Sequence, residues 1–392
     1  MLSLASNQLA RGSRGEAPHR RAQIRLESKA SASDLDGGTA LAATATPVAA
    51  AVAARRRTRA PAGAYDLAMF ATLLGALPRP PVGQADFDAA IRTAIAAQEE
   101  AGLEPLTDGR IRGSLSAWVD GDGILDTSAV LGAWTYAAAQ TTRAVKQALP
   151  GPYTVGRRLA GASDDEGTAR GAGRARGAGD RRSATTRAAE SLRAVIKELA
   201  AAGCPLIEIE ETQAHLIGAD ETERALFREA HERVTDRIEG THLSLSIVGG
   251  SAWEAGIETI FDAPYPSLAV DLIAGPDNWN LVTRLPRDRG VIAGALPGQD
   301  SPADAKEMLL WAARYAAASN RRGLERVGIG SAGTWASLAW EAAIEKMRRL
   351  GEAAQLAQLP GGEQLARALD PRAVDARRAA MGHDPSPPRN AR

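Results

Sequence analysis

The chain has 392 residues, 44% of them apolar, which is enough for the core of one large domain or two ordinary ones. Its 47 basic side chains balance 47 acidic ones, and no apolar run approaches ~20 residues, so we expect a small molecule as partner, with no nucleic acid and no membrane. The single cysteine, Cys204, excludes an internal disulfide and is typical of a reducing, cytoplasmic compartment.

Three segments differ in composition from the rest. Residues 1–63 are rich in Ser, Arg, Gly and Ala and lack the large apolar side chains of a core. They predict a disordered extension or a start codon assigned too far upstream, with an organellar transit peptide as the alternative. Residues 161–182 predict a flexible surface insert, and residues 358–392 predict a loosely held tail.

Residues 64–357 repeat a pattern of strand and then helix. Long helical patterns occur at 85–102, 185–203, 220–240 and 302–319. Short apolar or alternating runs occur at 70–76, 104–108, 143–149, 205–211, 241–248, 267–273, 290–296 and 325–330. Eight such units predict a single (β/α)8 TIM-type barrel. A doubly wound open sheet is the alternative, but no glycine-rich phosphate fingerprint follows the first strand.

Polar residues follow the first two predicted strands, where a barrel carries its chemistry. Arg79 comes after the first strand and could clamp a carboxylate or phosphate, or could be a surface arginine between two prolines. Asp108 ends the second strand beside Gly109 and is either a ligand contact or a turn former.

The fourth predicted strand carries three acids, Glu208, Glu210 and Glu211. Alternation places Glu208 and Glu210 on one face and Glu211 on the other. A carboxylate at this strand end could hold an amine or act as general acid or base, or Glu211 and a neighbour could simply pair with arginines. His215, just beyond, is expected to be a loop residue.

The fifth strand alternates His242, Ser244 and Ser246 with apolar residues, which predicts that the three polar side chains point into the barrel. Such groups serve a ligand or a metal, or they bond to one another. Asp271, in the apolar sixth strand, needs a partner, and His242 on the neighbouring strand is the predicted one. Ser331, in the small-residue run after strand eight, belongs to an anion nest or a tight turn.

Seven stretches in order resemble the catalytic barrel of cobalamin-independent methionine synthase, in the wider group that includes uroporphyrinogen decarboxylase. Over roughly residues 66–355, in the size range of one barrel, they read LLGALPRP, AIAAQEEAGLEPLTDG, LPGPYTV, AAAGCPLIEIEETQA, THLSLSIVGG, SLAVDL and ERVGIGSAG. Members of this family use zinc to hold a substrate thiol as thiolate, which attacks a methyl group on a folate or another donor. The resemblance implies a methyltransferase of methionine biosynthesis, with a homocysteine-like acceptor and a folate-type methyl donor.

The same resemblance implies a degenerate zinc site. The family pattern of His-x-Cys, Glu and Cys reads here His242-Leu243-Ser244, Asp271 and Ser331. Neutral hydroxyls are poor zinc ligands, so only His242 and Asp271 remain as metal ligands. Cys204 opens strand four and is expected near the opposite face of the barrel.

The amino-acid pocket implied by the resemblance is altered as well. The family's Gly-Ser is Gly75-Ala76 in this chain, and its Asp-Glu-Pro is Glu210-Glu211-Thr212. The acidic residue that the family carries after strand two is replaced by Arg110.

Three hypotheses follow from these residues. The first is a methyl- or alkyltransferase with His242, Asp271 and Glu210 as catalytic residues, served by a methyl-donor partner protein in place of the family's N-terminal half. The second is a metal-free lyase or decarboxylase in which His242 and Asp271 form an acid/base pair. The third is a catalytically silent binding protein on the same fold. Arg79, Asp108, Glu211 and Ser244 are the expected substrate contacts.

Overall fold

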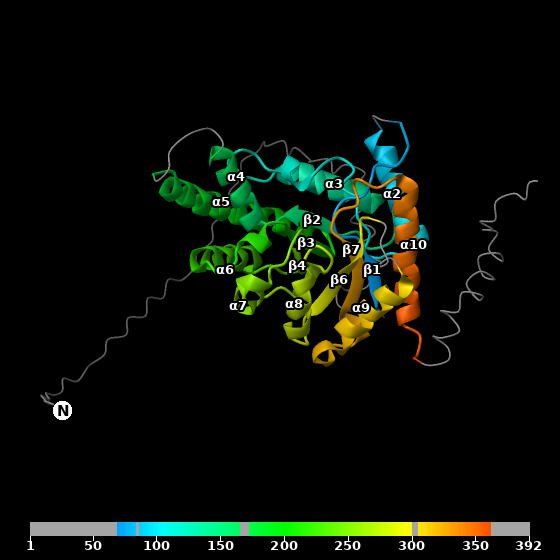
Figure 1. Cartoon of the computed structure of the whole chain (residues 1–392). Helices are drawn as coiled ribbons and strands as arrows, with labels where there is room; N and C mark the ends of the chain where they lie inside the picture. The colour runs from blue at the N-terminus through cyan, green and yellow to red at the C-terminus, as the bar shows by residue number, and fades with distance from the viewer. Residues whose placement is uncertain (1–68, 84–85, 165–171, 300–304, 362–392) are drawn as a thin grey trace, which may run out of the picture. The chain divides into compact units, whose positions relative to one another are not determined.

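The computed structural model describes residues 69–83, 86–164, 172–299 and 305–361 (Figure 1). Its centre is a parallel sheet in the order β1-β7-β6-β5-β4-β3-β2. The strands are β1 (Phe70–Thr72), β2 (Gln147–Pro150), β3 (Leu206–Glu211), β4 (His242–Ile247), β5 (Ser267–Asp271), β6 (Gly290–Pro297) and β7 (Val327–Ala332). Seven of the eight predicted strands are therefore confirmed, and the first pairs with the last, as in a barrel.

The eighth predicted strand, 104–108, lies between β1 and β2 without forming a regular ladder. Glu104 N donates to Ala71 O at 2.9 Å on one side, and Leu106 N donates to Ala144 O at 2.8 Å on the other. Leu106 and Val145 form an isolated parallel bridge. Pro105 has no N–H to donate, which explains why this segment is not a complete strand. The described part of the chain thus has a seven-stranded curled sheet rather than eight full strands.

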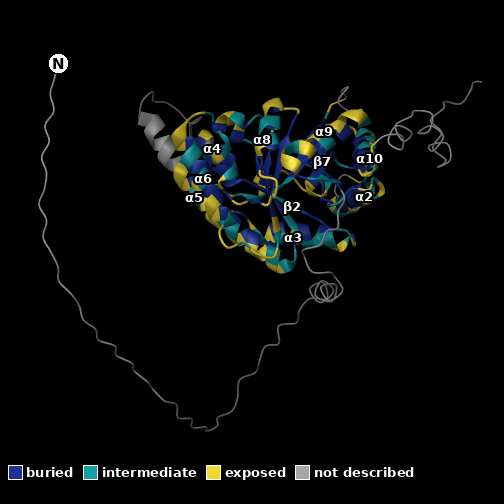
Figure 2. Cartoon of the chain, turned by 90° about the horizontal axis from the view of Figure 1, so that it is seen from below, coloured by how far each residue is buried: buried dark blue, intermediate teal, exposed yellow. Residues whose placement is uncertain are grey.

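Helices cover the outer face of the sheet (Figures 1 and 2). They are α2 (Phe87–Glu100), α3 (Thr127–Ala139), α4 (Pro152–Asp164), α5 (Ala172–Ala202), α6 (Glu221–Thr235), α7 (Ile257–Phe261), α8 (Trp279–Arg284), α9 (Lys306–Ala318) and α10 (Trp340–Ala357). All four predicted helices are present. Three of the helices begin at aspartates whose side chains accept backbone N–H groups of the first turn, Asp86, Asp126 and Asp220.

The predicted extension, 1–63, lies outside the described residues, as does most of the tail. The predicted insert is described in part: residues 161–164 end α4, residues 172–182 begin α5, and residues 165–171 lie outside. Among the described residues, none of the helices combines the length and the apolar content of a membrane span.

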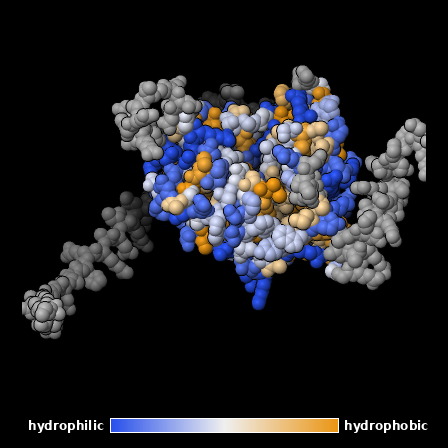
Figure 3. All heavy atoms as spheres, viewed as in Figure 1, coloured by the Kyte–Doolittle hydropathy of each residue, from blue (hydrophilic) through white to orange (hydrophobic). Residues whose placement is uncertain are grey.

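Apolar side chains pack in two places, as expected for a barrel. A large buried cluster fills the space between sheet and helices, and a small one inside the curled sheet consists of Leu74, Ala269 and Ile292, with Phe70 against it. Figure 2 shows the buried strands enclosed by helices whose outer sides are exposed. On the face drawn in Figure 3, hydrophilic residues predominate and apolar ones form small groups. The small inner cluster occupies only the β1, β5 and β6 side, which leaves the β2 to β4 side for polar groups.

Candidate functional site

The polar side of the barrel interior is built on β3. Glu208 and Glu210 alternate with apolar residues and are both buried, and in register they lie beside Ser244 and Ser246 of β4. The prediction that Ser244 and Ser246 point into the barrel is therefore confirmed, whereas His242, predicted to point inward with them, is exposed at the start of β4. Each of the two glutamates pairs with a cation from the preceding units of the barrel, which removes most of the cost of burying a carboxylate.

Arg110 pairs with Glu210 through two hydrogen bonds. Its Nη1 donates to Glu210 Oε1 at 3.0 Å, and its Nη2 donates to Oε2. Both side chains are about nine-tenths buried, at 10% and 7% exposed. Burial disfavours the charged guanidinium, but the nearby charges of Glu210, Glu208 and Asp108 outweigh it and raise the pKa of Arg110. Arg110 adopts a left-handed conformation at φ 53°, so its backbone is held in an unfavourable region to direct the side chain inward.

Lys146 pairs with Glu208 deeper in the barrel. The Nζ to Oε2 distance is 2.7 Å, and both side chains are 1% exposed. The second oxygen, Glu208 Oε1, has no hydrogen-bond partner among the described residues, nor do the hydroxyls of Ser244 and Ser246. A buried polar atom without a partner is costly, so such atoms mark places where water or a ligand binds.

A small cavity adjoins these groups. Its volume is about 10 Å³, which is about the room for one water molecule. The residues around it are Leu73, Gly75, Thr107, Asp108, Arg110, Lys146, Gln147, Ala148 and Glu208. It therefore lies just beyond the carboxyl ends of β1 and the 104–107 segment, beside the first residues of β2 and the middle of β3.

Asp108 borders this cavity and has a perturbed pKa. Burial raises the pKa above the ordinary 3.8, against the lowering effect of a hydrogen bond from Arg110 N and of the charges on Arg110 and Arg112. The hydrogen bond, from Arg110 N to Asp108 Oδ1, is 2.9 Å long. Asp108 is thus a turn former, as one interpretation of the sequence predicted, and its carboxyl is buried beside the cavity; its contact with a ligand stays a prediction.

Glu211 is a structural residue, which corrects its prediction as a substrate contact. It lies on the outer face of the sheet, and its carboxylate accepts from Tyr153 N at 3.0 Å and Thr154 N at 2.8 Å in the first turn of α4. His231 Nε2 of α6 lies 3.1 Å from the same carboxylate, and His231 Nδ1 bonds to the Tyr265 hydroxyl at 2.8 Å. Burial and the charge of Glu211 raise the pKa of Tyr265. A carboxylate at a helix N-terminus is stabilised by the free N–H groups there, so Glu211 joins β3 to α4 and α6.

The predicted pair of His242 and Asp271 is wrong. His242 is the first residue of β4 and bonds through Nε2 to Ser267 Oγ at 2.8 Å, whereas Asp271 is the last residue of β5. Ser244 pairs with Ser267, so His242 and Asp271 are offset by six positions, roughly 20 Å at 3.3 Å per residue. Desolvation lowers the pKa of His242, but the residue lies at the amino end of the sheet, opposite the expected site.

The remaining family positions do not form a zinc site either. Asp271 Oδ1 accepts from Ile273 N at 2.9 Å and Ala274 N at 2.8 Å. Ser331 Oγ is 2.7 Å from both Leu74 N and Leu74 O, so it joins β7 to β1. Within the described ranges, no three His, Cys, Asp or Glu side chains are grouped to hold a metal ion. Cys204 precedes β3, at the amino end of the sheet as predicted, so these donors do not fit a zinc-thiolate centre.

Arg79 and His215 lie apart from the buried cluster. Arg79 is half-buried, with its guanidinium carbon 4.3 Å from the centre of the Phe87 ring, and donates to Gly83 O at 3.4 Å. His215 is exposed and lies in the single 3-10 turn Ala214–Leu216 within the connection from β3 to α6, where a loop was predicted. The interpretation of the sequence missed Lys146 and did not assign Arg110 to the site. A lysine inside the apolar run RAVKQAL was the available signal, because a buried cation needs an anionic partner.

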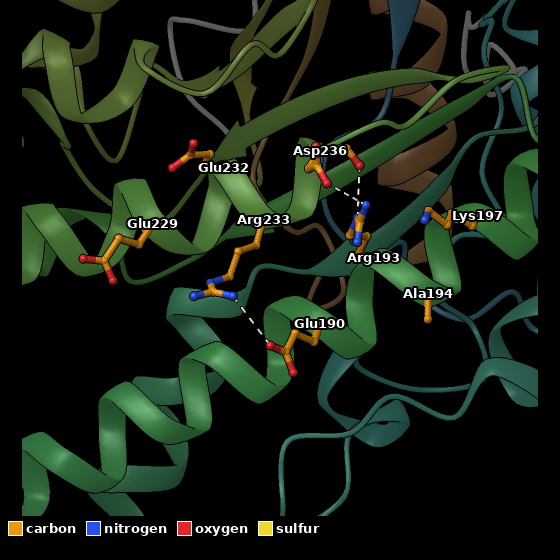
Figure 4. A pocket seen from close by; sticks show the side chains of 8 residues that line it. All are labelled: Glu190, Arg193, Ala194, Lys197, Glu229, Glu232, Arg233 and Asp236. Carbon is orange, nitrogen blue, oxygen red and sulfur yellow. Dashed lines mark hydrogen bonds and ion pairs between the residues drawn. The ribbon is translucent and has the colours of Figure 1, made fainter. Parts of the chain in front are cut away.

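A wider groove, of about 700 Å³, lies elsewhere, between α5 and α6 (Figure 4). Arg193 pairs with Asp236 at 2.7 Å and Arg233 with Glu190 at 3.6 Å across it. The other lining residues are Ala194, Lys197, Glu229 and Glu232. This groove is on the helical layer and carries mixed, solvated charges, so we assign the functional site to the barrel interior.

Comparison with known proteins identifies the fold. No family model matches the chain, and no curated protein matches it. A B12-independent methionine synthase from Shewanella sp. in complex with selenomethionine is similar over 74% of this chain and 98% of its own, with a TM-score of 0.57 and 15% identity. A putative vitamin-B12 independent methionine synthase from Listeria monocytogenes covers 73% and 97%, with a TM-score of 0.52 and 16% identity. A methyltransferase from Methanosarcina mazei covers 74% and 94%, with a TM-score of 0.54 and 13% identity. At these identities the chain shares the barrel fold of such proteins.

Proposed function

We propose that this protein is an enzyme that transfers a methyl or alkyl group to a small thiol-type acceptor in the barrel interior, without a zinc-bound thiolate. The observation that carries the proposal is the buried group of Asp108, Arg110 and Glu210 at the carboxyl ends of the strands. Its fold is that of three solved proteins named as methionine synthases or a methyltransferase. In barrels this edge of the sheet carries the reacting groups.

Asp108 is the proposed base. The acceptor S–H loses its proton to the Asp108 carboxylate, the sulfur forms a bond to the methyl carbon, and the bond from that carbon to the donor nitrogen breaks. The proton passes from Asp108 to the leaving nitrogen of a folate-type donor, so atoms and charge balance. A carboxyl whose pKa is raised by burial is a stronger base than an ordinary aspartate, which suits it to accept the proton of a thiol.

Arg110 sets the proposed acceptor class. Because its guanidinium already occupies both oxygens of Glu210, an ammonium group on the acceptor would have to displace it. The proposed acceptor is therefore a thiol that lacks an ammonium group, and homocysteine is the less favoured substrate.

An assay of methyl transfer in the presence of a metal chelator tests this proposal. The full chain is incubated with a folate-type methyl donor and either mercaptopropionate or homocysteine, and methylated products are followed by mass spectrometry. We expect methylation of mercaptopropionate that persists in chelator and falls by about a hundredfold in Asp108→Asn. Turnover that appears only with added zinc, or that Asp108→Asn leaves unchanged, contradicts the proposal.

A catalytically silent binding protein is the second candidate, and the complete pairing of Glu210 by Arg110 favours it. Calorimetric binding of a thiol or a folate analogue without any product would support it. The lyase hypothesis loses its proposed acid/base pair, because His242 and Asp271 lie at opposite ends of the sheet.

A further inference from the structure

An exposed group of large side chains lies on α9 and α8, far from the barrel interior. Met308, Trp311 and Tyr315 of α9 are 48%, 50% and 41% exposed, and their spacing of three and four residues places them on one face of the helix. The rings of Trp311 and Tyr315 stack at 5.1 Å and 16°. Trp279, which begins α8, meets both of them edge-on at 5.2 Å. We call these four residues the aromatic patch.

The described chain ends beside this patch. Arg314, the neighbour of Tyr315, donates through Nη2 to Leu359 O at 2.9 Å and approaches Ala357 O at 3.5 Å. These contacts hold the end of α10 against α9. The chain therefore continues past residue 361 from a point next to the aromatic patch.

The sequence that follows has the pattern of a short apolar helix face. Residues 362–370 read GEQLARALD, and a proline, Pro371, comes next. Leu365 and Leu369 are four residues apart and would share one face of a helix, which Pro371 would end. Nine helical residues are ~13 Å long, and the α9 face from Met308 to Tyr315 is ~10 Å long at 1.5 Å per residue. The lengths match.

We propose that residues 362–370 bind back onto the aromatic patch as a short helix, with Leu365 and Leu369 against Trp311 and Tyr315. Two exposed aromatic rings and a methionine gain from burial against leucine side chains. The segment needs only one turn of chain to reach them from Gly361, so the loop that closes is short and its entropic cost is small. This proposal is independent of the chemistry in the barrel.

Hydrogen exchange of the full chain tests the docking from both sides. We expect the amides of 362–370 to exchange at least about tenfold more slowly than in an unstructured peptide. Protection is lost in Leu365→Asp/Leu369→Asp, and equally in Trp311→Ser/Tyr315→Ser, which changes only the receiving surface. The matched control is Arg367→Asp, which alters the net charge by the same two units on the opposite face of the helix and keeps the protection.

Three outcomes would overturn the proposal. One is exchange of 362–370 at the unprotected rate in the unaltered chain. Another is protection that survives Trp311→Ser/Tyr315→Ser while thermal unfolding confirms that this variant is folded, because the segment then binds elsewhere. The third is protection that disappears on dilution together with a change in mass by light scattering, because the patch is then covered by a second copy of the chain.

Discussion

Arg110 and Glu210, 100 residues apart in sequence, are joined by two hydrogen bonds inside the barrel. The guanidinium comes from a loop and the carboxylate from the carboxyl-terminal half of β3, so the pair fastens the loop after the 104–107 segment onto β3. Both groups are removed from water, so the loss of either partner would leave the other as a buried charge without a counterion.

Removing Arg110 is expected to destabilise the protein strongly. Arg110→Ala leaves the Glu210 carboxylate buried without a cation, which we expect to lower the free energy of unfolding by about 3–5 kcal/mol. Urea unfolding measures the change. The control is Arg112→Ala, which removes an exposed ion pair to Asp88 and is expected to cost less than about 1 kcal/mol. Equal losses in the two variants would mean that the Arg110 pair is no more buried than a surface pair.

Asp108 is expected to make stability fall as the pH rises. Its folded pKa lies above the ordinary 3.8, so the folded state holds this proton more tightly than the unfolded state. The stabilisation is complete below the unfolded pKa and is lost as the pH rises through the folded pKa. We therefore expect Asp108→Asn to gain stability relative to the unaltered chain as the pH rises above the ordinary 3.8. A difference that stays constant as the pH rises would place the pKa of Asp108 at its ordinary value.

Glu211 is expected to matter for folding and not for ligand binding. Glu211→Gln presents an NH₂ group to donors at the start of α4, and we expect a loss of about 2–3 kcal/mol in the free energy of unfolding. Glu229→Gln, in an exposed pair with Arg182, is the control and should change stability by less than about 1 kcal/mol. If ligand affinity in Glu211→Gln falls at temperatures where the variant is fully folded, Glu211 contributes to the site after all.

His242 is expected to be irrelevant to metal content and to turnover. Because the residue lies at the amino end of β4, His242→Ala should leave both the zinc content by elemental analysis and the rate of methyl transfer unchanged. We expect far less than one zinc per chain in either protein. Stoichiometric zinc that disappears in His242→Ala would show that His242 does hold a metal.

The strands and helices were predictable because their patterns are strong. Seven of the eight predicted strands and all four predicted helices follow from apolar runs and from a period of 3.6. The 104–108 segment differs only because Pro105 interrupts its hydrogen bonding. The inward face of β3 and β4 was also predictable, since Glu208, Glu210, Ser244 and Ser246 obey the two-residue alternation of a strand.

The position of a residue along the barrel axis, nearer the amino or the carboxyl ends of the strands, was not predictable from the same pattern. Alternation gives the face that His242 occupies but not its height, and His242 and Ser246 look equivalent until the pairing register with β3 is known. Likewise, nothing local distinguishes the inward Glu210 as the partner of Arg110, because that pairing depends on how a distant loop closes over the strand.

Two close approaches link the two ends of the described barrel. Gln358 Nε2 donates to Met69 O at 3.1 Å, and a Cβ at Gly351 of α10 would lie 1.7 Å from Ala101 O beyond α2, so the last helix lies directly against the first unit. Residues 69 and 361 can therefore be bridged by a short linker, and the chain can be opened instead at the exposed Glu239–Gly240. Such a circular permutant retains every strand pairing. We therefore expect it to form the same fold, although its strands and helices follow one another along the chain from a different starting point.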